Sequence, residues 1–188
     1  MTLIETEPPL AEPVTLADLK AHMRIDLDDE DALLDSLIRV ARAHLEAVTG
    51  TALMPRGLRL ILDDWPEGPV IELLRTPVQS IDAIRVYDID GTPHEVAADG
   101  WLLDATARPA RLAVRERLRP GQPINGVEIE FTAGFASANE IPPELVRAIL
   151  LHAAYLYEFR GAVSADMQPA AIPAGYERLI GPWMRRAL

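Results

Sequence analysis

The acidic run at residues 26–31 is the densest group of side chains that could bind a cation. In a calcium-binding loop of the EF-hand type, oxygen ligands stand at alternating positions, the sixth residue is glycine and the twelfth is glutamate. Acids alternate here from Asp26 to Glu30, but the sixth position is Asp31 and the twelfth is Leu37. The run fails the pattern at both diagnostic positions, and we therefore expect no bound metal.

A helix start accounts for the same acids more simply. The side chain of Asp28 or Asp29 is expected to cap a following helix, because short polar side chains accept hydrogen bonds from the unpaired amides of a first turn. Acids in that turn also face the positive end of the helix dipole. A small metal-dependent hydrolase that uses residues 26–31 is kept as the lesser alternative function.

No pattern typical of nucleophilic or phosphate-transfer chemistry accompanies the acidic run. The chain contains no cysteine, and the motifs GxSxG, GxxxxGKS, GxxxxGKT and GxGxxG are absent. Its four histidines form no HExxH pair; they are His22, His44, His94 and His152. Because His152 stands among apolar residues, it is expected to be a hydrogen-bonded core histidine. We predict that the protein is not an enzyme, has no catalytic residue and uses no cofactor.

Composition limits the remaining classes. The 188 residues are 49% hydrophobic and 25% charged, which is typical of a globular protein. The net charge of −11 disfavours a tight nucleic-acid binder or a DNA-binding regulator, because phosphate contacts need basic surface. No charged-then-apolar leader opens the sequence, and the longest apolar stretch, residues 145–157, is too short for a bilayer and is interrupted by Arg147. We expect no membrane association.

Apolar residues at helical spacing predict three helices, at residues 15–24, 29–49 and 143–160. Thr15 is expected to cap the first helix, Gly50 to end the second, and Pro143 to occupy the first turn of the third. Residues 1–14 hold three prolines among acids and are expected to form an extended N-terminal arm. Residues 15–161 should form a single domain, followed by a C-terminal segment, 162–188, with a short docking helix from residue 176.

A strand period replaces the helical one between residues 57 and 133. The turn at residues 88–91, of sequence DIDG, predicts a hairpin. No strand is followed by a helical crossover, which favours antiparallel pairing. Strands are expected at residues 58–62, 70–74, 81–87, 94–96, 101–103, 111–115 and 127–132. The predicted fold class is α+β: a helical core, made of an N-terminal helix pair and a helix from the C-terminal half, with an inserted small antiparallel β-sheet region.

The helix expected at residues 143–160 is apolar around most of its circumference. A helix of this kind must be covered on more than one side. One domain of this size offers a single core, so we expect another subunit to cover the second side. Two apolar stripes can be drawn on it: Leu145, Ile149, His152, Leu156 and Phe159, and Val146, Leu150, Ala153 and Tyr157.

Three segments together resemble the head–tail connector (adaptor) family of HK97-like tailed phages, which is also found in gene transfer agents. The first is VTLADLKAHMRIDLDDEDALLDSLIRVARAHLEAVTGTAL at residues 14–53, a short helix and an acidic turn before a long helix. The second is VEIEFTAGFASANEIPPELVRAILLHAAYLYEFRGA at residues 127–162, a strand and loop before a proline-initiated helix. The third is the closing IPAGYERLIGPWMRRAL at residues 172–188. They cover about half of the chain.

The resemblance implies a structural virion protein that is made in the bacterial host cytoplasm and located at the head–tail junction of a phage-like particle. Members of the family form rings, typically dodecameric, under the portal and extend the DNA channel toward the tail. The implied partners are other copies of the chain, the portal protein, and a stopper or tail-side neck protein. DNA would pass through without sequence-specific binding, which suits an acidic protein.

The family's C-terminal tail commonly contacts the portal, which implies portal-contact residues in the closing segment. The expected set is Leu179, Ile180, Trp183, Met184, Arg185 and Arg186. The opposite interpretation, that Trp183 closes the protein's own core, stays open. Another neck role, stopper or tail terminator, is the alternative within the same particle. Those proteins tend to be β-dominated, whereas helices bracket the expected sheet here.

Overall fold

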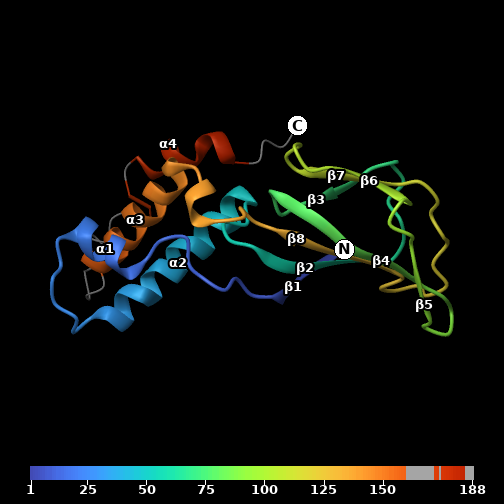
Figure 1. The fold of residues 1–188 in the computed structure, drawn as a ribbon, viewed down its shortest axis with the longest axis horizontal. Coiled ribbons are helices and arrows are strands. Elements are labelled where there is room, and N and C mark those ends of the chain that lie inside the picture. The colour runs from blue at the N-terminus through green and yellow to red at the C-terminus, as the bar shows by residue number, and fades with distance from the viewer. Residues whose placement is uncertain (160–171, 174, 185–188) are drawn as a thin grey trace, which may run out of the picture. The chain divides into compact units, whose positions relative to one another are not determined.

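The computed structural model describes residues 1–159, 172–173 and 175–184, and the chain forms two compact units (Figure 1). We call Met1–Leu10 with Met54–Ala136 the β unit, and Ala11–Leu53 with Ser137–Leu188 the helical unit. The predicted α+β class is confirmed, with antiparallel sheets inserted between helices of the sequence. The predicted limits of a single adaptor domain at 15–161 stay a prediction, because compactness of two units does not decide whether they fold separately.

The helical unit contains the helices α1 (Leu16–Met23), α2 (Asp31–Thr49), α3 (Pro143–Glu158) and α4 (Tyr176–Ile180). Two 3-10 turns, η1 (Ala138–Glu140) and η3 (Gly181–Trp183), accompany them. Thr15 caps α1, as expected, and Asp18 completes a capping box: the Asp18 amide donates to Thr15 Oγ1 over 3.1 Å, and the Thr15 amide donates to Asp18 Oδ2 over 3.0 Å. Helix α2 ends at its C-cap, Gly50, which adopts a φ of 70°.

The start of α2 differs from the prediction. Its N-cap is Glu30, which makes no side-chain capping bond to the described residues, so the expected cap by Asp28 or Asp29 is wrong. The carboxylates of Asp28 and Asp31 both bind Lys20 Nζ on α1 instead. An ammonium group offers a carboxylate a charge-assisted hydrogen bond, which is stronger than one from a neutral amide.

A single apolar core holds the helical unit together. Helix α3 lies against α1, α2 and α4. Each fully buried aliphatic side chain stabilises such a core by about 1.5–3 kcal/mol. The buried residues include Leu19, Leu34, Ile38, Ala41, Leu45, Leu145, Ile149 and Ile180. None of the helices in the described residues is long and apolar enough to cross a membrane.

Two antiparallel sheets form the β unit. The larger has the strand order β1-β2-β8-β4-β5 and the smaller β3-β7-β6. One face of β2, β7 and β8 is buried in strict alternation, as in sheets that are packed face to face. The strands are β1 (Thr2–Glu7), β2 (Arg56–Leu62), β3 (Ile71–Leu73), β4 (Val78–Tyr87), β5 (Pro93–Glu95), β6 (Trp101–Asp104), β7 (Ala110–Val114) and β8 (Val127–Ala133).

The predicted hairpin between β4 and β5 is present, with Val86 opposite His94. Its turn is held by Asp88 Oδ1, which accepts the amides of Asp90 and Thr92, each over 2.9 Å. Gly91 takes a φ of 81°, which a side chain would strain. The DIDG sequence therefore forms the turn through both its aspartate and its glycine.

Part of the expected extended N-terminal arm, residues 1–14, is paired in a sheet. Residues 2–7 form β1, which pairs antiparallel with β2 from Thr2 opposite Ile61 to Glu7 opposite Gly57. Their sequence lacks an apolar alternation because β1 lies at the sheet edge and only Leu3 is partly covered. Its pairing depends mainly on backbone hydrogen bonds, which leave no signal in the side-chain pattern.

Candidate interaction surfaces

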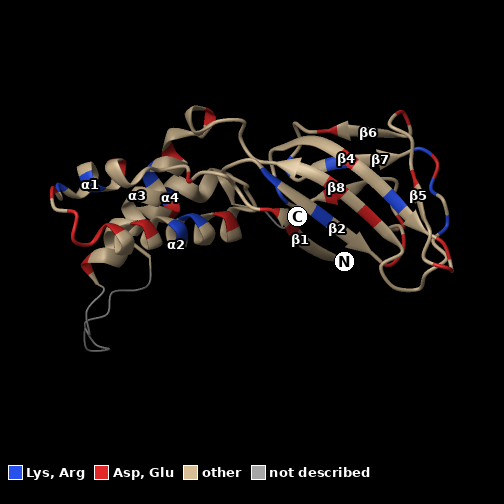
Figure 2. Ribbon diagram, turned by 60° about the horizontal axis from the view of Figure 1, so that its bottom comes forward, with Lys and Arg blue, Asp and Glu red and all other residues tan. Residues whose placement is uncertain are grey.

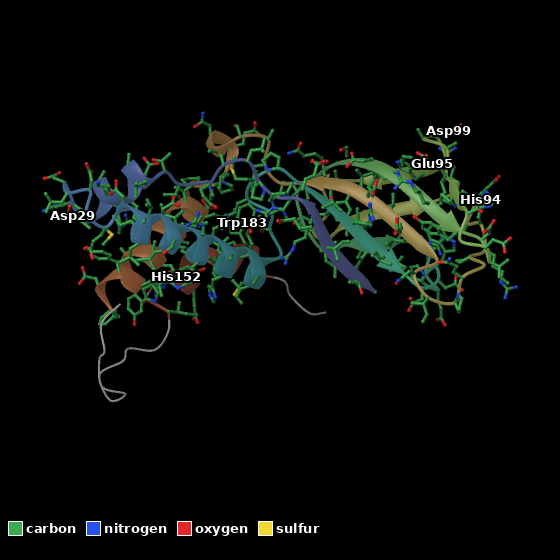
Figure 3. The ribbon with its side chains drawn as sticks, turned by 90° about the horizontal axis from the view of Figure 1, so that it is seen from below. Asp29, His94, Glu95, Asp99, His152 and Trp183 are labelled. Atoms are coloured by element: carbon green, nitrogen blue, oxygen red, sulfur yellow. The ribbon has the colours of Figure 1, made fainter. Side chains whose placement is uncertain are left out.

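The expected portal-contact residues are divided between the core and the surface of the helical unit. Ile180 is 3% exposed. The indole nitrogen of Trp183, which is labelled in Figure 3, donates to Glu144 Oε1 on α3 over 3.1 Å. Leu179 is half-buried, whereas Met184 is 46% exposed. Arg185 and Arg186 lie outside the described residues. The segment is thus attached to its own helical unit, because α4 packs on α3, Ile180 is buried and Trp183 binds Glu144, and Met184 is exposed.

Three aromatic side chains meet beneath α4. The rings of His44 on α2, His152 on α3 and Tyr176 on α4 have centroids 5.0–5.9 Å apart. Within the described part of the chain, His44 Nε2, His152 Nδ1 and the Tyr176 hydroxyl are buried without a hydrogen-bond partner. His152 is thus the expected core histidine, but Nδ1 lacks the expected hydrogen bond. The sequence gives no sign that these three residues meet, since they are distant along the chain.

Burial shifts the titration of two members of this cluster. Burial first, and the charge of the neighbouring His44 second, together lower the pKa of His152 to about 4. Burial also raises the pKa of Tyr176 to about 12. Both rings are therefore neutral near pH 7, which suits two polar side chains enclosed among apolar helices.

The acidic run is neutralised in part by Lys20. The hydrogen bond from Lys20 lowers the pKa of the Asp28 carboxyl, and the bonds to Asp28 and Asp31 raise the pKa of the Lys20 ammonium. Across the residues that the structure places, no group of three or more His, Asp or Glu side chains could hold a metal ion. The run joins the end of α1 to the start of α2.

A second charged network connects the C-terminal half of α2 to the segments before α1 and after α2. Arg42 binds Glu12 through Nε over 2.6 Å and Glu46 through one of its terminal nitrogens over 2.8 Å. Burial alone would lower the pKa of Arg42, but the hydrogen bonds and charges of Glu12 and Glu46 raise it above its ordinary value. Glu46 is 6% exposed, and its other oxygen accepts the Leu53 amide. The sequence pattern had not indicated this buried carboxylate.

The outer face of the larger sheet carries a ladder of alternating charges. Glu130 on β8 lies between Arg59 on β2 and Arg85 on β4, and Figure 2 shows acidic and basic positions side by side on these strands. Burial opposes ionisation of Glu130, yet the two arginines lower the pKa of its carboxyl. On the same face Tyr87 donates to Glu128 over 2.8 Å. This face is polar and internally paired.

Chains of similar fold and sequence occur in gene transfer agent particles. The chain is similar over its full length to a chain in the neck of an empty gene transfer agent (GTA) particle computed with C6 symmetry: the two are 37% identical, with a TM-score of 0.81, covering 100% of this chain and 98% of that one. A chain of the native GTA virion is 36% identical, with a TM-score of 0.81 and the same coverage. A chain from the neck of the native particle computed with C12 symmetry is 35% identical, with a TM-score of 0.80, again with the same coverage.

The sequence profile of phage gp6-like head–tail connector proteins matches residues 13–89, which span α1, α2 and the strands through β4. No curated protein matches the chain. Given the profile match and the full-length relatives at more than a third identity, the chain belongs to the phage gp6-like head–tail connector family.

Proposed function

We propose that this protein is the adaptor of a head–tail connector: a ring subunit that joins the portal to the next neck component and extends the DNA channel. The carrying observation is the full-length similarity, at 37% identity and a TM-score of 0.81, to a chain in a GTA neck. Both the helical and the β unit take part in that match, since it covers the whole chain. The work of such a subunit is mechanical, and its place is the head–tail junction of a phage-like particle.

Twelve copies per ring is the proposed stoichiometry. One related neck was computed with C12 symmetry and another with C6 symmetry, and a twelvefold ring also satisfies C6 symmetry. A repeated head-to-tail contact closes into a ring when its rotation divides the circle evenly. The long helices α2 and α3 supply the proposed ring surfaces, because α3 leaves apolar side chains such as Leu150 and Leu156 only partly covered.

The proposed contact with the portal involves the segment that contains α4 and η3. The burial of Ile180 and the hydrogen bond of Trp183 hold this segment on the helical unit, and the exposed Met184 and the half-buried Leu179 remain available to a partner. Arg185 and Arg186 follow directly in the sequence and would add positive charge to the contact. The proposed portal contact thus combines an anchored α4 with the exposed Met184 and the two arginines that follow it in the sequence.

The charge of the chain fits a channel for DNA. At a net charge of −11, a ring would repel phosphate on average and would let DNA pass without lasting contacts. Sequence-specific binding is not part of the proposal. In the alternative neck roles, stopper or tail terminator, the partner would be the tail side and not the portal.

Light scattering after size-exclusion chromatography tests the proposal. The protein is mixed with the purified portal of the same particle, and the mass of the portal peak is measured. We expect a gain equal to twelve copies of the 20.7-kDa chain. An unchanged portal peak, together with binding to tail-side neck proteins, would reject the adaptor role in favour of stopper or terminator.

A further inference from the structure

Strand β1 lies at the edge of the larger sheet and is attached to it mainly through backbone pairing. Five of its six residues are exposed, and only Leu3, opposite Leu60, is partly covered. Within the described residues β1 pairs with β2 alone. A strand held in this way gains the same hydrogen bonds from any β2 of the same sequence.

Side-chain contacts also favour the pairing of β1 with β2. The Arg56 side chain, 9% exposed, reaches Glu5 over 3.1 Å. A Cβ atom at Gly57 would lie 2.8 Å from Thr6 Oγ1 and 3.2 Å from Glu7 Cβ, so a side chain there would force β1 to shift. The edge of β2 thus fits the 2–7 segment closely, and without this segment the sheet would present an unpaired edge.

The connection that follows β1 is suited to reaching a second molecule. Residues 8–13 include three prolines, and Leu10 is fully exposed. Proline-rich segments are stiff and extended, and six residues span about 20 Å. The connection is fixed at each end by an ion pair, Glu5 with Arg56 in the β unit and Glu12 with Arg42 in the helical unit. The boundary between the two units falls directly after Leu10.

We propose that β1 of each copy pairs with β2 of the neighbouring copy in the assembled ring. This inference rests on the proposed ring function and adds the contact that links its subunits. Exchange of an identical strand replaces every contact of the free chain with an equal one, so it costs little. Repeated around a closed ring, it leaves no β2 edge unpaired and joins each subunit to the next through a strand.

Two single-cysteine variants test the exchange, Thr2→Cys and Ile61→Cys. These residues are opposite each other in the β1–β2 register. Opposed residues of antiparallel strands have Cα atoms about 4.5–5.5 Å apart, within the range that a disulfide bridges. The chain has no cysteine of its own, so each variant carries one thiol. A disulfide between the two variants joins two molecules by necessity.

The variants are mixed in equal amounts, assembled on the portal, oxidised and run on a non-reducing gel. We expect covalent dimers from mixed rings, and none from rings of either variant alone or from the mixed proteins without portal. Rings that are intact by electron microscopy but yield no mixed dimer would overturn the exchange while leaving the adaptor function standing. Failure to form any ring would instead reject the adaptor function, and the exchange with it.

A double variant carrying both cysteines provides the complementary reading. Oxidised as the free chain, it should close an internal disulfide, with no gain in mass and no titratable thiol. Kept reduced until it is assembled on the portal, and only then oxidised, it should give a ladder of covalent multimers. Internal disulfides alone in intact rings would show that β1 stays on its own β2 and would contradict the proposal.

Discussion

Glu46 Oε1 accepts a hydrogen bond from the backbone amide of Leu53 over 2.8 Å, so a buried carboxylate fixes the path of the chain after α2. The other oxygen of Glu46 binds Arg42, which in turn binds Glu12. This one side chain therefore joins the end of α2 to both the segment that follows it and the segment that precedes α1.

Replacing Glu46 by alanine should destabilise the protein strongly. The change leaves the Leu53 amide without its acceptor and removes one of the two carboxylates that neutralise a largely buried Arg42. We expect the free energy of unfolding to fall by about 3 kcal/mol, measured by urea denaturation. Asp35→Ala is the matched control, since its ion pair with Arg39 is exposed on the same helix and should contribute less than about 1 kcal/mol. Equal losses in the two variants would show that Glu46 has no special role.

The free energy of unfolding should decrease as the pH is lowered, because His152 becomes protonated. Its pKa is about 4 in the folded chain, against an ordinary value of 6.5, so the unfolded chain binds the extra proton. The stabilisation is complete above pH 6.5 and is lost progressively as the pH drops toward 4, by up to about 3 kcal/mol. We expect His152→Leu to remove this part of the pH dependence in melting curves recorded from pH 7.5 to 4. His94→Gln, an exposed control, should retain it. Parallel curves for the wild type and His152→Leu would contradict the account.

Divalent cations should leave the melting temperature unchanged. Lys20 occupies the carboxylates of Asp28 and Asp31, which a cation at residues 26–31 would need. A native-state metal site raises the melting temperature by mass action. Differential scanning fluorimetry with calcium, magnesium, manganese or a chelator is the measurement. A saturable increase with any of these ions would revive the hydrolase alternative.

Met184→Glu should weaken portal binding without changing stability. Met184 is exposed, and a carboxylate there would have to be desolvated in an apolar contact. Binding to the portal, measured by size-exclusion chromatography, should fall at least tenfold, while the melting temperature stays within a degree or two of the wild type. Leu102→Glu on β6 is the control, since Leu102 is an exposed apolar residue of the other unit and should have no effect. Normal portal binding by Met184→Glu would remove this residue from the proposed contact.

Truncation after Gly175 is a less specific test of the same segment. It removes Tyr176, which is fully buried, and Ile180, which is 3% exposed, from the core of the helical unit. We expect the free energy of unfolding to fall by several kcal/mol, because each is a large buried side chain. A truncated protein could therefore lose portal binding through unfolding alone. Met184→Glu, which leaves these buried residues in place, distinguishes the loss of the contact from the loss of the fold.

Local signals in the sequence predicted most of the helices and strands. Thr15 and Gly50 mark the ends of helices through capping geometry that depends on neighbouring residues, and the DIDG turn defines a hairpin in the same way. The structure differs where distant residues compete. Lys20, eight residues before Asp28, binds the carboxylate that was expected to cap α2. Likewise, the sequence of residues 2–7 did not predict a strand, because β1 is defined by its pairing with the distant β2.

The interaction surfaces were less predictable than the elements. Sequence similarity indicated the closing segment, but not that Ile180 is buried while Met184 is exposed. The cluster of His44, His152 and Tyr176 forms only when three helices meet. Such properties depend on tertiary packing, which a one-dimensional pattern does not contain.

Electron microscopy of the protein mixed with its portal tests the adaptor function most directly. We predict a twelvefold ring of this protein on the narrow end of the portal, continuing its channel. Portal particles that remain bare, with this protein free in solution, would contradict the adaptor function and move the protein to another position in the neck.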